Sequence, residues 1–545
     1  MHVSYIIMII NICFKNYIGK RKSNLLIITF LVFYMFITGF SPSIVRASIM
    51  QIVFLVSSIV YRKNDIITSI SLSLLIILIY NPFLIKNLGL IFSYTATIGI
   101  ILLNKNVKNI LKSIKIKNKK WKYRINVKTL KVISKLQDIL SISISAQLVV
   151  FPIMIYQSNI FDTYFLITNL LVSLIIAPLL IISFITILSS FIFIPVATIF
   201  LHILNILVSI LIGISSFSQI PFSKIYFPTP KVYIIVFYYI LLFILNIIYS
   251  LYHKKQLSNT EIRARNIIAL VKYKVYSNKS RIVKFIFIFL VILIIFKMFP
   301  KSLKIHFVDV NQGDCTFIVT PMKKTILIDG GGTTSESFDV GKNTLLPYIL
   351  DRGYTSIDYI LISHMDQDHV GGLLTIMQEI KVRNVIISKQ AENSENFQKL
   401  IKLVEEKRIN LIIVNKGDRL KIETDLYFDV LWPDTTNFIT ENALNNNSIV
   451  CKLCYKDFSM LFTGDIEEIA EKRILQEYKN KLILDSTILK VGHHGSKTSS
   501  TREFIERIKP KIALIGVGKN NKFGHPNDEV LERLENLRCK YISNR

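Results

Sequence analysis

The sequence predicts a polytopic α-helical membrane domain over residues 1–300 and a soluble α/β domain over residues 301–545. The first prediction rests on long apolar runs and on charge: residues 1–300 hold 32 Lys and Arg but only four acidic residues, a net charge of +28. The second rests on short strand patterns separated by Gly-rich loops, in a segment whose net charge is only +1. A hydrophobic content of 51% excludes a disordered chain, and five scattered cysteines exclude a disulfide-rich scaffold.

About nine membrane spans are predicted in the first part of the chain. A helix needs about 20 mostly apolar residues to cross the hydrocarbon core of a bilayer. Runs of that order lie near residues 24–40, 44–60, 66–80, 83–103, 138–157, 163–187, 189–215, 231–250 and 283–299. The apolar run at residues 4–14 is too short to be assigned as a span.

The basic loops predict the orientation of these spans. Twelve basic residues and no acidic residue lie between Asn104 and Leu136, and nine basic residues with one Glu lie between His253 and Lys284. With nine spans, these loops and two smaller basic loops fall on one side, which the positive-inside bias places in the cytoplasm. The last span then carries residues 301–545 to the outer face. Attraction to anionic membrane lipid is sufficient to explain the basic loops, and contact with nucleic-acid phosphates is the alternative.

Three polar residues lie within the apolar runs: Arg46, Gln147 and Asn169. Polar groups are costly in contact with lipid, so we expect these side chains to face a bundle interior or a water-filled path. Helix–helix contact, or snorkelling of the Arg side chain towards the membrane surface, is the alternative.

The second part carries a cluster of possible metal ligands. Residues 358–363 read as a buried strand, and His364, Asp366, Asp368 and His369 follow it directly, before two glycines. Histidines and carboxylates in a loop after a strand can converge on one point, as a metal site requires. The glycines allow the backbone to turn tightly beside them.

Further candidate ligands lie at the ends of later strands. Asp465 ends a Thr-Gly-Asp segment, His493 and His494 lie in Gly-His-His-Gly-Ser, and His525 lies in Gly-His-Pro. Five of the nine histidines of the chain therefore lie in three clusters. Hydrogen bonds that only stabilise the loops are the alternative interpretation, because buried polar groups need partners.

Taken in this order, the motifs resemble the metallo-β-lactamase-like domain of the ComEC family of DNA-uptake proteins. The segment Val308–Asp314 is also similar to that family, with Asn311 where Gly is usual. In the apolar part, Gly39–Met50, Asn81–Ile100 and Ala146–Pro152 resemble the competence-domain signatures of the family. The resemblance runs from about residue 39 to residue 526, and it implies an αββα sandwich for the soluble domain.

The resemblance implies a divalent metal centre with one or two ions. The better-preserved position is expected to use Asp368, His369, Asp465 and one of His493 and His494. The other would rely on His364, Asp366 and a bridging Asp465, because the wider superfamily usually has His in place of Asp366, and a further histidine is missing around residues 445–448. More carboxylate ligands make a harder site, so Mn²⁺ competes with Zn²⁺.

The reaction implied for this domain is metal-assisted phosphodiester hydrolysis, as in a nuclease. Asp465 is expected to bridge or hold the metal, and Asp366 or Asp368 to orient the attacking water. The metal together with Lys497 or His525 would offset the charge of the transition state.

The function implied by the resemblance is DNA uptake across the bacterial cytoplasmic membrane in natural transformation. The outward domain would cleave one strand, and the membrane domain would pass the other strand inward, past Arg46, Gln147 and Asn169. A charge of +1 on the soluble domain disfavours tight, unassisted DNA binding, so we expect a separate DNA-receptor protein as well as cytoplasmic translocation partners. Family members generally begin with a small OB-like domain and further helices before the Gly39 signature, so we expect an N-terminally truncated or shortened chain.

Three alternative functions stay open at this point, as does the oligomeric state. One is a membrane-anchored metallo-hydrolase of a non-DNA phosphodiester. Another is a translocation channel with a catalytically inactive hydrolase domain. The third is a non-functional truncated remnant.

Overall fold

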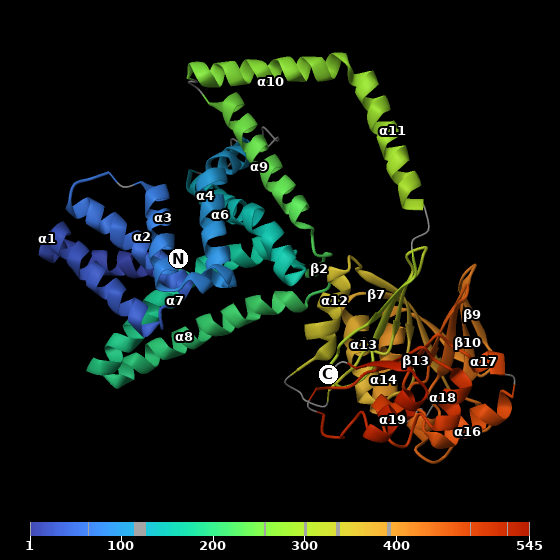
Figure 1. Cartoon of the computed structure of the whole chain (residues 1–545). Coiled ribbons are helices and arrows are strands. Elements are labelled where there is room, and N and C mark those ends of the chain that lie inside the picture. The colour runs from blue at the N-terminus through green and yellow to red at the C-terminus, as the bar shows by residue number, and fades with distance from the viewer. Residues whose placement is uncertain are drawn as a thin grey trace. The chain divides into compact units, whose positions relative to one another are not determined.

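The computed structural model describes residues 2–63, 65–113, 127–254, 258–298, 302–333, 338–389, 394–479, 481–519 and 521–543 (Figure 1). The chain divides into two compact units, Met1–Lys274 and Val275–Arg545, which we call the helical unit and the sheet unit. The domain border predicted at residue 300 lies outside the described residues, as do residues 114–126 of the predicted basic loop.

The helical unit consists almost entirely of helices. They are α1 (His2–Ile37), α2 (Pro42–Ile59), α3 (Ile66–Tyr80), α4 (Leu88–Ser113), α6 (Val127–Ser158), α7 (Phe165–Ile192), α8 (Ile194–Ser215), α9 (Val232–His253) and α10 (Asn259–Ser277). Short 3₁₀ turns lie at Pro82–Lys86 and Ser216–Gln219, and β1 (Ile160–Asp162) pairs with β2 (Lys224–Tyr226). The helix α10 was not predicted, because its residues read as a basic loop.

Six of the described helices are long and apolar enough to cross a membrane: α2, α4, α6, α7, α8 and α9. The runs predicted at 24–40, 66–80 and 283–299 coincide with α1, α3 and α11 (Lys279–Met298), which are not among those six. Of these, α3 is an apolar helix of only 15 residues.

Helices α4, α6 and α9 are joined by a close contact between two backbones and by a side-chain hydrogen bond to a backbone carbonyl. A Cβ atom at Gly99 of α4 would lie 2.5 Å from the carbonyl oxygen of Ser145 in α6, so only glycine fits there. Pro152 has no N–H to donate to the carbonyl of Leu148 one turn earlier. The hydroxyl of Tyr238 in α9 donates to that carbonyl instead, at 2.8 Å.

The sheet unit begins near α11 and contains two mixed sheets. The six-stranded sheet has the order β3 (Lys304–Phe307), β4 (Thr316–Val319), β5 (Thr325–Ile328), β6 (Ser356–Leu361), β7 (Lys381–Ser388) and β8 (Asn410–Val414). The seven-stranded sheet has the order β15 (Lys540–Ser543), β14 (Ile512–Ile515), β13 (Ile488–Lys490), β12 (Phe458–Phe462), β11 (Val450–Tyr455), β10 (Leu426–Trp432) and β9 (Arg419–Glu423). Neighbouring strands are parallel from β5 to β8 and from β12 to β15, and antiparallel elsewhere.

The two sheets share one apolar core, and helices cover their outer faces. Ile326 and Leu361 of the six-stranded sheet belong to the same buried cluster as Phe428 and Met460 of the seven-stranded sheet. The outer face of the seven-stranded sheet packs against α16 (Glu468–Glu477), α17 (Lys481–Leu484), α18 (Arg502–Ile508) and α19 (Asp528–Asn536). On the six-stranded sheet, α13 (Gln367–Glu379) contacts β7, and α12 (Leu346–Asp351) and α14 (Glu395–Lys407) lie beside it. The predicted αββα sandwich is therefore confirmed.

Candidate metal centre

Loops at the ends of strands bring the predicted ligands of the sheet unit together. The loop after β6 and the first turn of α13 carry His364, Asp366, Asp368 and His369. The loops after β12 and β13 carry Asp465 and the pair His493–His494. Because β6 lies in one sheet and β12 and β13 in the other, the ligands can meet only when the two sheets are packed together.

Glycine makes this approach of the loops possible. A Cβ atom at Gly332, in the loop after β5, would lie 1.8 Å from the carbonyl oxygen of Gln367 at the start of α13. A Cβ atom at Gly313 would lie 2.2 Å from the carbonyl oxygen of Asp368. A side chain at either position would push away the loop that carries His364 and Asp366. Glycine is therefore needed at both positions for close packing against the start of α13.

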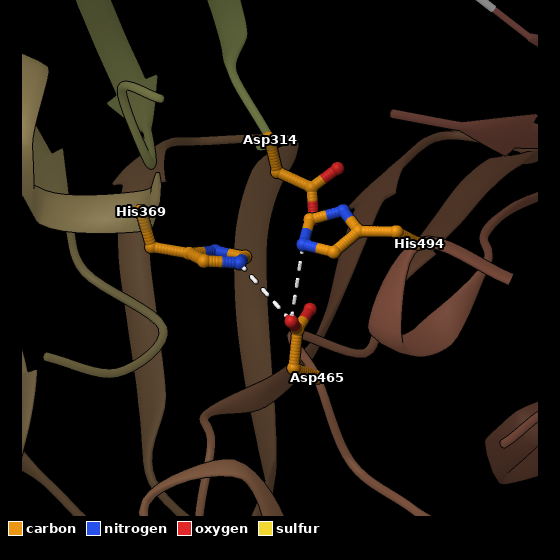
Figure 2. A group of neighbouring side chains, drawn as sticks. All are labelled: Asp314, His369, Asp465 and His494. Atoms are coloured by element: carbon orange, nitrogen blue, oxygen red, sulfur yellow. Dashed lines mark ion pairs between the residues drawn. The ribbon is translucent and has the colours of Figure 1, made fainter. Parts of the chain in front are cut away.

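Asp465 lies at the centre of the cluster (Figure 2). Its Oδ2 atom is 3.2 Å from Nε2 of His369 and 3.2 Å from Nε2 of His494. The Nε2 atom of His494 is also 3.2 Å from Oδ2 of Asp368. Asp465, His369 and His494 are buried, whereas Asp368 is partly exposed. Four potential donor atoms from three separate loops thus face one point.

The opposite nitrogen of each ring is held by a hydrogen bond that sets the ring's orientation. His369 Nδ1 donates to Oδ2 of Asp329 at 3.0 Å, and His494 Nδ1 donates to the carbonyl oxygen of Gly516 at 2.8 Å. When either ring is deprotonated, the lone pair of its Nε2 faces the centre. This is the arrangement of histidines that ligate a metal.

A buried lysine holds the other oxygen of Asp465. The ammonium group of Lys490 forms an ion pair with Asp314, lies 3.3 Å from Oδ1 of Asp465, and donates to the carbonyl oxygen of Gly464 at 2.8 Å. Burial lowers the pKa of Lys490, but the two carboxylates outweigh this effect and raise it above its ordinary value. The lysine is therefore a fixed positive charge beside the cluster.

The donor set fits a divalent metal ion. Among the described residues, Nε2 of His364, of His369 and of His494 are buried nitrogens that form no hydrogen bond. Buried polar atoms without a hydrogen bond are rare in folded proteins, and a metal ion would satisfy these nitrogens. Asp314, His369, Asp465 and His494 can each offer one atom within 4.8 Å of the others. Because Lys490 already neutralises Asp314, we regard Asp368 as the better fourth ligand.

Without a metal, the carboxylates hold protons on the two histidines. Burial lowers the pKa of His494, but Asp465 and Asp314 outweigh it and raise the pKa to about 10. The pKa of His369 is raised well above its ordinary value by Asp465 and Asp329, again against the effect of burial. The pKa of Asp465 is lowered well below its usual range by His369, His494 and Lys490, against burial. A metal must therefore displace protons from this site.

The residues of the second predicted metal position lie next to this cluster. His364 Nε2 is 3.5 Å from Oδ2 of Asp366, and the ring centres of His364 and His369 are 4.1 Å apart. Asn445 lies in the segment where a further histidine was expected, and its amide is 3.5 Å from Nε2 of His493. This position has only one nitrogen ligand.

Of the remaining predicted residues, His493 is not part of the cluster around Asp465. Both His493 and His494 have positive φ angles, 45° and 54°. His493 Nδ1 lies 3.3 Å from Oε1 of Glu467, and its ring centre is 5.9 Å from that of His525. His525 is half-buried, and burial together with His493 and His494 lowers its pKa. Lys497 is exposed on the following loop. The structure thus places His494, rather than His493, in the cluster.

Three residues of the site were not predicted: Asp314, Asp329 and Lys490. Asp314 lies in the family-like segment Val308–Asp314, and Asp329 directly precedes the three glycines. Both are therefore next to motifs that were recognised. Lys490 lies in an apolar strand two residues before the Gly-His-His-Gly-Ser motif. The signal that could have identified Lys490 is its position, because a charged residue at the end of a buried strand needs a partner of opposite charge.

The three polar residues predicted to face a channel lie on three helices of the helical unit. Arg46 is on α2 and contacts α4, Gln147 is on α6 with its amide 3.9 Å from the sulfur of Met154, and Asn169 is exposed on α7. They share no hydrogen bond with one another among the described residues. Their role in a channel stays a prediction.

Two family models match the chain. The model of the competence protein family matches residues 1–251, and that of the metallo-β-lactamase superfamily matches residues 308–519. The two matches agree with the helical unit and with the strands and ligands of the sheet unit.

Individual proteins are also similar to the chain. The chain is 26% identical to ComE operon protein 3 of Bacillus subtilis over 537 residues, which are 95% of this chain and 62% of that protein. It is 29% identical to Recombination protein 2 of Haemophilus influenzae over 248 residues, 44% of this chain and 28% of that protein. The chain therefore spans less than two thirds of the length of these relatives.

Among solved structures, the chain resembles Igni18, a metallo hydrolase from Ignicoccus hospitalis. The identity is 14% and the TM-score 0.31, over 45% of this chain and 95% of that one. At that score, the likeness adds nothing to the assignment from the family models.

Proposed function

The chain belongs to the ComEC family of competence proteins, and we propose that it takes up DNA across the bacterial cytoplasmic membrane in natural transformation. In this proposal, the membrane-capable helices pass one DNA strand inward. The sheet unit, on the outer face of the membrane, cleaves the phosphodiester backbone of the other strand. The basic loops of the helical unit support this orientation through the positive-inside bias.

The proposal that the sheet unit is a hydrolase rests on the convergence of donor atoms on Oδ2 of Asp465. His369, His494 and Asp368 supply the other donors, and the opposite nitrogen of each ring is hydrogen-bonded. Three buried imidazole nitrogens here face carboxylate oxygens at 3.2–3.5 Å without forming a hydrogen bond among the described residues, and a divalent ion between these groups would bind both the nitrogens and the carboxylates.

Each residue of the site has a distinct part in the proposed hydrolysis. A divalent ion held by Asp368, His369, Asp465 and His494 supplies Lewis acidity, which makes water nucleophilic near neutral pH and offsets phosphate charge. Lys490 holds Asp465 so that Oδ2 faces the histidines. Asp366 is more exposed and borders a cavity of about 730 Å³, where it orients the attacking water and accepts its proton. Lys497 offsets negative charge on the substrate, and His525, whose lowered pKa leaves its ring neutral near pH 7, donates a hydrogen bond to it.

We propose Mn²⁺ as a competitor of Zn²⁺ at this site. Of the donors around Asp465, two are carboxylates and two are imidazoles, and the neighbouring position adds Asp366. Carboxylate oxygen favours harder ions than thiolate or imidazole does. Whether one or two ions bind depends on His364 and Asp366, because the neighbouring histidine, His369, already belongs to the cluster around Asp465.

The test is cleavage of end-labelled single-stranded DNA by the full chain purified in detergent, with Mn²⁺ or Zn²⁺ added. We expect Asp465→Asn to slow cleavage by at least about a hundredfold, because it weakens metal binding. Asp457→Asn is the matched control, since Asp457 is an exposed aspartate at the other end of the same strand. Wild type and the control should lose activity in a chelator and regain it when metal is restored.

Other outcomes would favour other functions. Cleavage of a small phosphodiester without cleavage of DNA would indicate a non-DNA substrate. A folded, metal-loaded chain that cleaves neither would indicate a hydrolase unit that is inactive. Equal rates for wild type and Asp465→Asn would exclude the metal centre described above.

A further inference from the structure

Arg46 is a charged residue inside a group of apolar helices, and its known partners are uncharged. It lies in the second turn of α2, and its Nε atom donates to the hydroxyl of Ser93 in α4 at 2.7 Å. Its Nη1 atom donates to the hydroxyl of Thr97, also at 2.7 Å. The ring of Tyr94 lies 5.6 Å from Cζ of Arg46, in the position for a cation–π contact.

This group of residues is held rigidly by three helices. The hydroxyls of Tyr94 in α4 and Ser73 in α3 are 2.8 Å apart, and both side chains are buried. Thr97 in turn donates to the backbone carbonyl of Ser93. The guanidinium group is therefore positioned by α4, which is itself bonded to α3.

No acidic residue of the helical unit neutralises Arg46. Residues 1–300 contain four acidic side chains, all within the described residues, and each is engaged elsewhere. Asp65 accepts hydrogen bonds at the start of α3, Asp138 pairs with Lys108, Asp162 accepts from the backbone N–H of Tyr164, and Glu261 pairs with Lys254. A cation in apolar surroundings without a counter-charge is costly, and such residues usually serve function.

The guanidinium group also has donors to spare. It carries five N–H groups, and its hydrogen bonds within the described residues use Nε and Nη1 but not Nη2. Beside it, the hydroxyl of Ser43 is exposed and lies 3.4 Å from that of Ser93. Guanidinium donors and neighbouring hydroxyls in fixed positions are the groups that bind oxyanions.

We propose that Arg46, with Ser43 and Ser93, forms a binding site for a phosphodiester monoanion in the helical unit. A phosphodiester group carries one negative charge and two free oxygens, which matches one guanidinium with spare donors. The two possible sources are the backbone of a DNA strand, which rests on the uptake function proposed above, and the headgroup of a phospholipid. The chemistry of recognition is the same for both.

The experiment compares wild type with Arg46→Gln, Arg46→Lys and, as control, Arg62→Gln. Arg62 is exposed and lies just beyond the other end of α2, so its substitution removes the same charge outside the site. One arm measures entry of a fluorescent single-stranded oligonucleotide into vesicles that contain the full chain. The other arm counts phospholipid molecules that stay bound to the purified chain, by native mass spectrometry.

With DNA as the ligand, Arg46→Gln should reduce oligonucleotide entry by roughly tenfold or more, the loss expected for a charge-assisted hydrogen bond. Arg46→Lys should retain part of the entry, because it keeps the charge and loses the planar fork. With lipid as the ligand, Arg46→Gln should lose one bound phospholipid while oligonucleotide entry is unchanged. Arg62→Gln should match wild type in both arms.

The proposal is overturned when neither arm distinguishes Arg46→Gln from Arg62→Gln. Wild type that admits no oligonucleotide would count against the uptake function, and the phospholipid arm would then decide on the Arg46 site alone. Should Arg46→Gln fail to fold, as judged by thermal unfolding in detergent, Arg46→Lys takes its place. That variant must then differ from Arg62→Lys in at least one arm.

Discussion

The ammonium group of Lys490 lies 3.3 Å from Oδ1 of Asp465, while Oδ2 of the same carboxylate faces His369 and His494. The two oxygens thus have separate partners, a cation fixed in the protein on one side and imidazole nitrogens on the other. The second partner of Lys490, Asp314, balances its charge. The orientation of the central carboxylate is therefore determined by a residue that would not itself bind the metal.

We expect Lys490→Met to lower the free energy of unfolding of the sheet unit by about 3–5 kcal/mol, because Asp314 and Asp465 would be left buried without their cation. The measurement is a urea titration of the full chain, followed by the fluorescence of Trp432. This tryptophan is buried in the sheet unit, and a Trp121→Phe background makes it the sole tryptophan. Lys497→Met, at an exposed lysine, is the control. A loss below about 1 kcal/mol would contradict a role for this ion pair in stability.

Metal affinity should rise with pH between about 5 and 8. The pKa of His494 is raised to about 10 and that of His369 is also raised, so both hold protons at neutral pH when no metal is bound. Each proton displaced by the metal makes affinity increase up to about tenfold per pH unit. Calorimetric titration in buffers of different ionisation enthalpy measures the protons released. Binding that releases no protons would exclude these histidines as ligands.

Glu471 should make the sheet unit less stable as pH rises. Burial raises the pKa of this carboxyl from an ordinary 4.5 to about 7, although it accepts hydrogen bonds from the backbone N–H groups of Ser500 and Thr501. A raised pKa contributes stability that is fully present below pH 4.5 and is lost as pH rises through about 7. The total loss is about 3 kcal/mol.

The same urea titration at pH 5 and pH 8 measures this effect of Glu471. Glu471→Gln cannot ionise, so its stability should change less between the two pH values than that of wild type. Glu468→Gln, at an exposed glutamate of the same helix, serves as the control and should keep the full dependence. Parallel pH profiles for wild type and Glu471→Gln would rule out the proposed titration.

Asp366→His should shift the metal preference from Mn²⁺ towards Zn²⁺. The Oδ2 atom of Asp366 lies 3.5 Å from Nε2 of His364, so a histidine there would add a second nitrogen ligand to that position. Imidazole favours Zn²⁺, whereas carboxylate favours harder ions. Competition between the two metals, measured on the full chain by elemental analysis after dialysis, gives the ratio. An unchanged ratio would show that residues 364 and 366 do not hold a metal.

Much of the architecture could be predicted from patterns along the chain. A helix that crosses a membrane needs an apolar run of a certain length, and a strand in a sandwich needs a short buried run, so both leave local signals. The ligand motifs were recognisable because each follows a strand directly. Helix α10 was not predicted because five of its 19 residues are charged and its longest apolar run, residues 267–271, is too short to indicate a membrane span.

The sequence by itself determined the two unlike halves, the αββα fold class and the set of histidines and carboxylates at strand ends. Only the tertiary structure decided that His494 joins the cluster around Asp465, whereas His493 lies beside Glu467 and His525. Only the structure brought Lys490 and Asp314 to Asp465, and left Arg46 without an acidic partner. The physical reason is that charge pairing depends on distance in space, whereas a sequence records only distance along the chain.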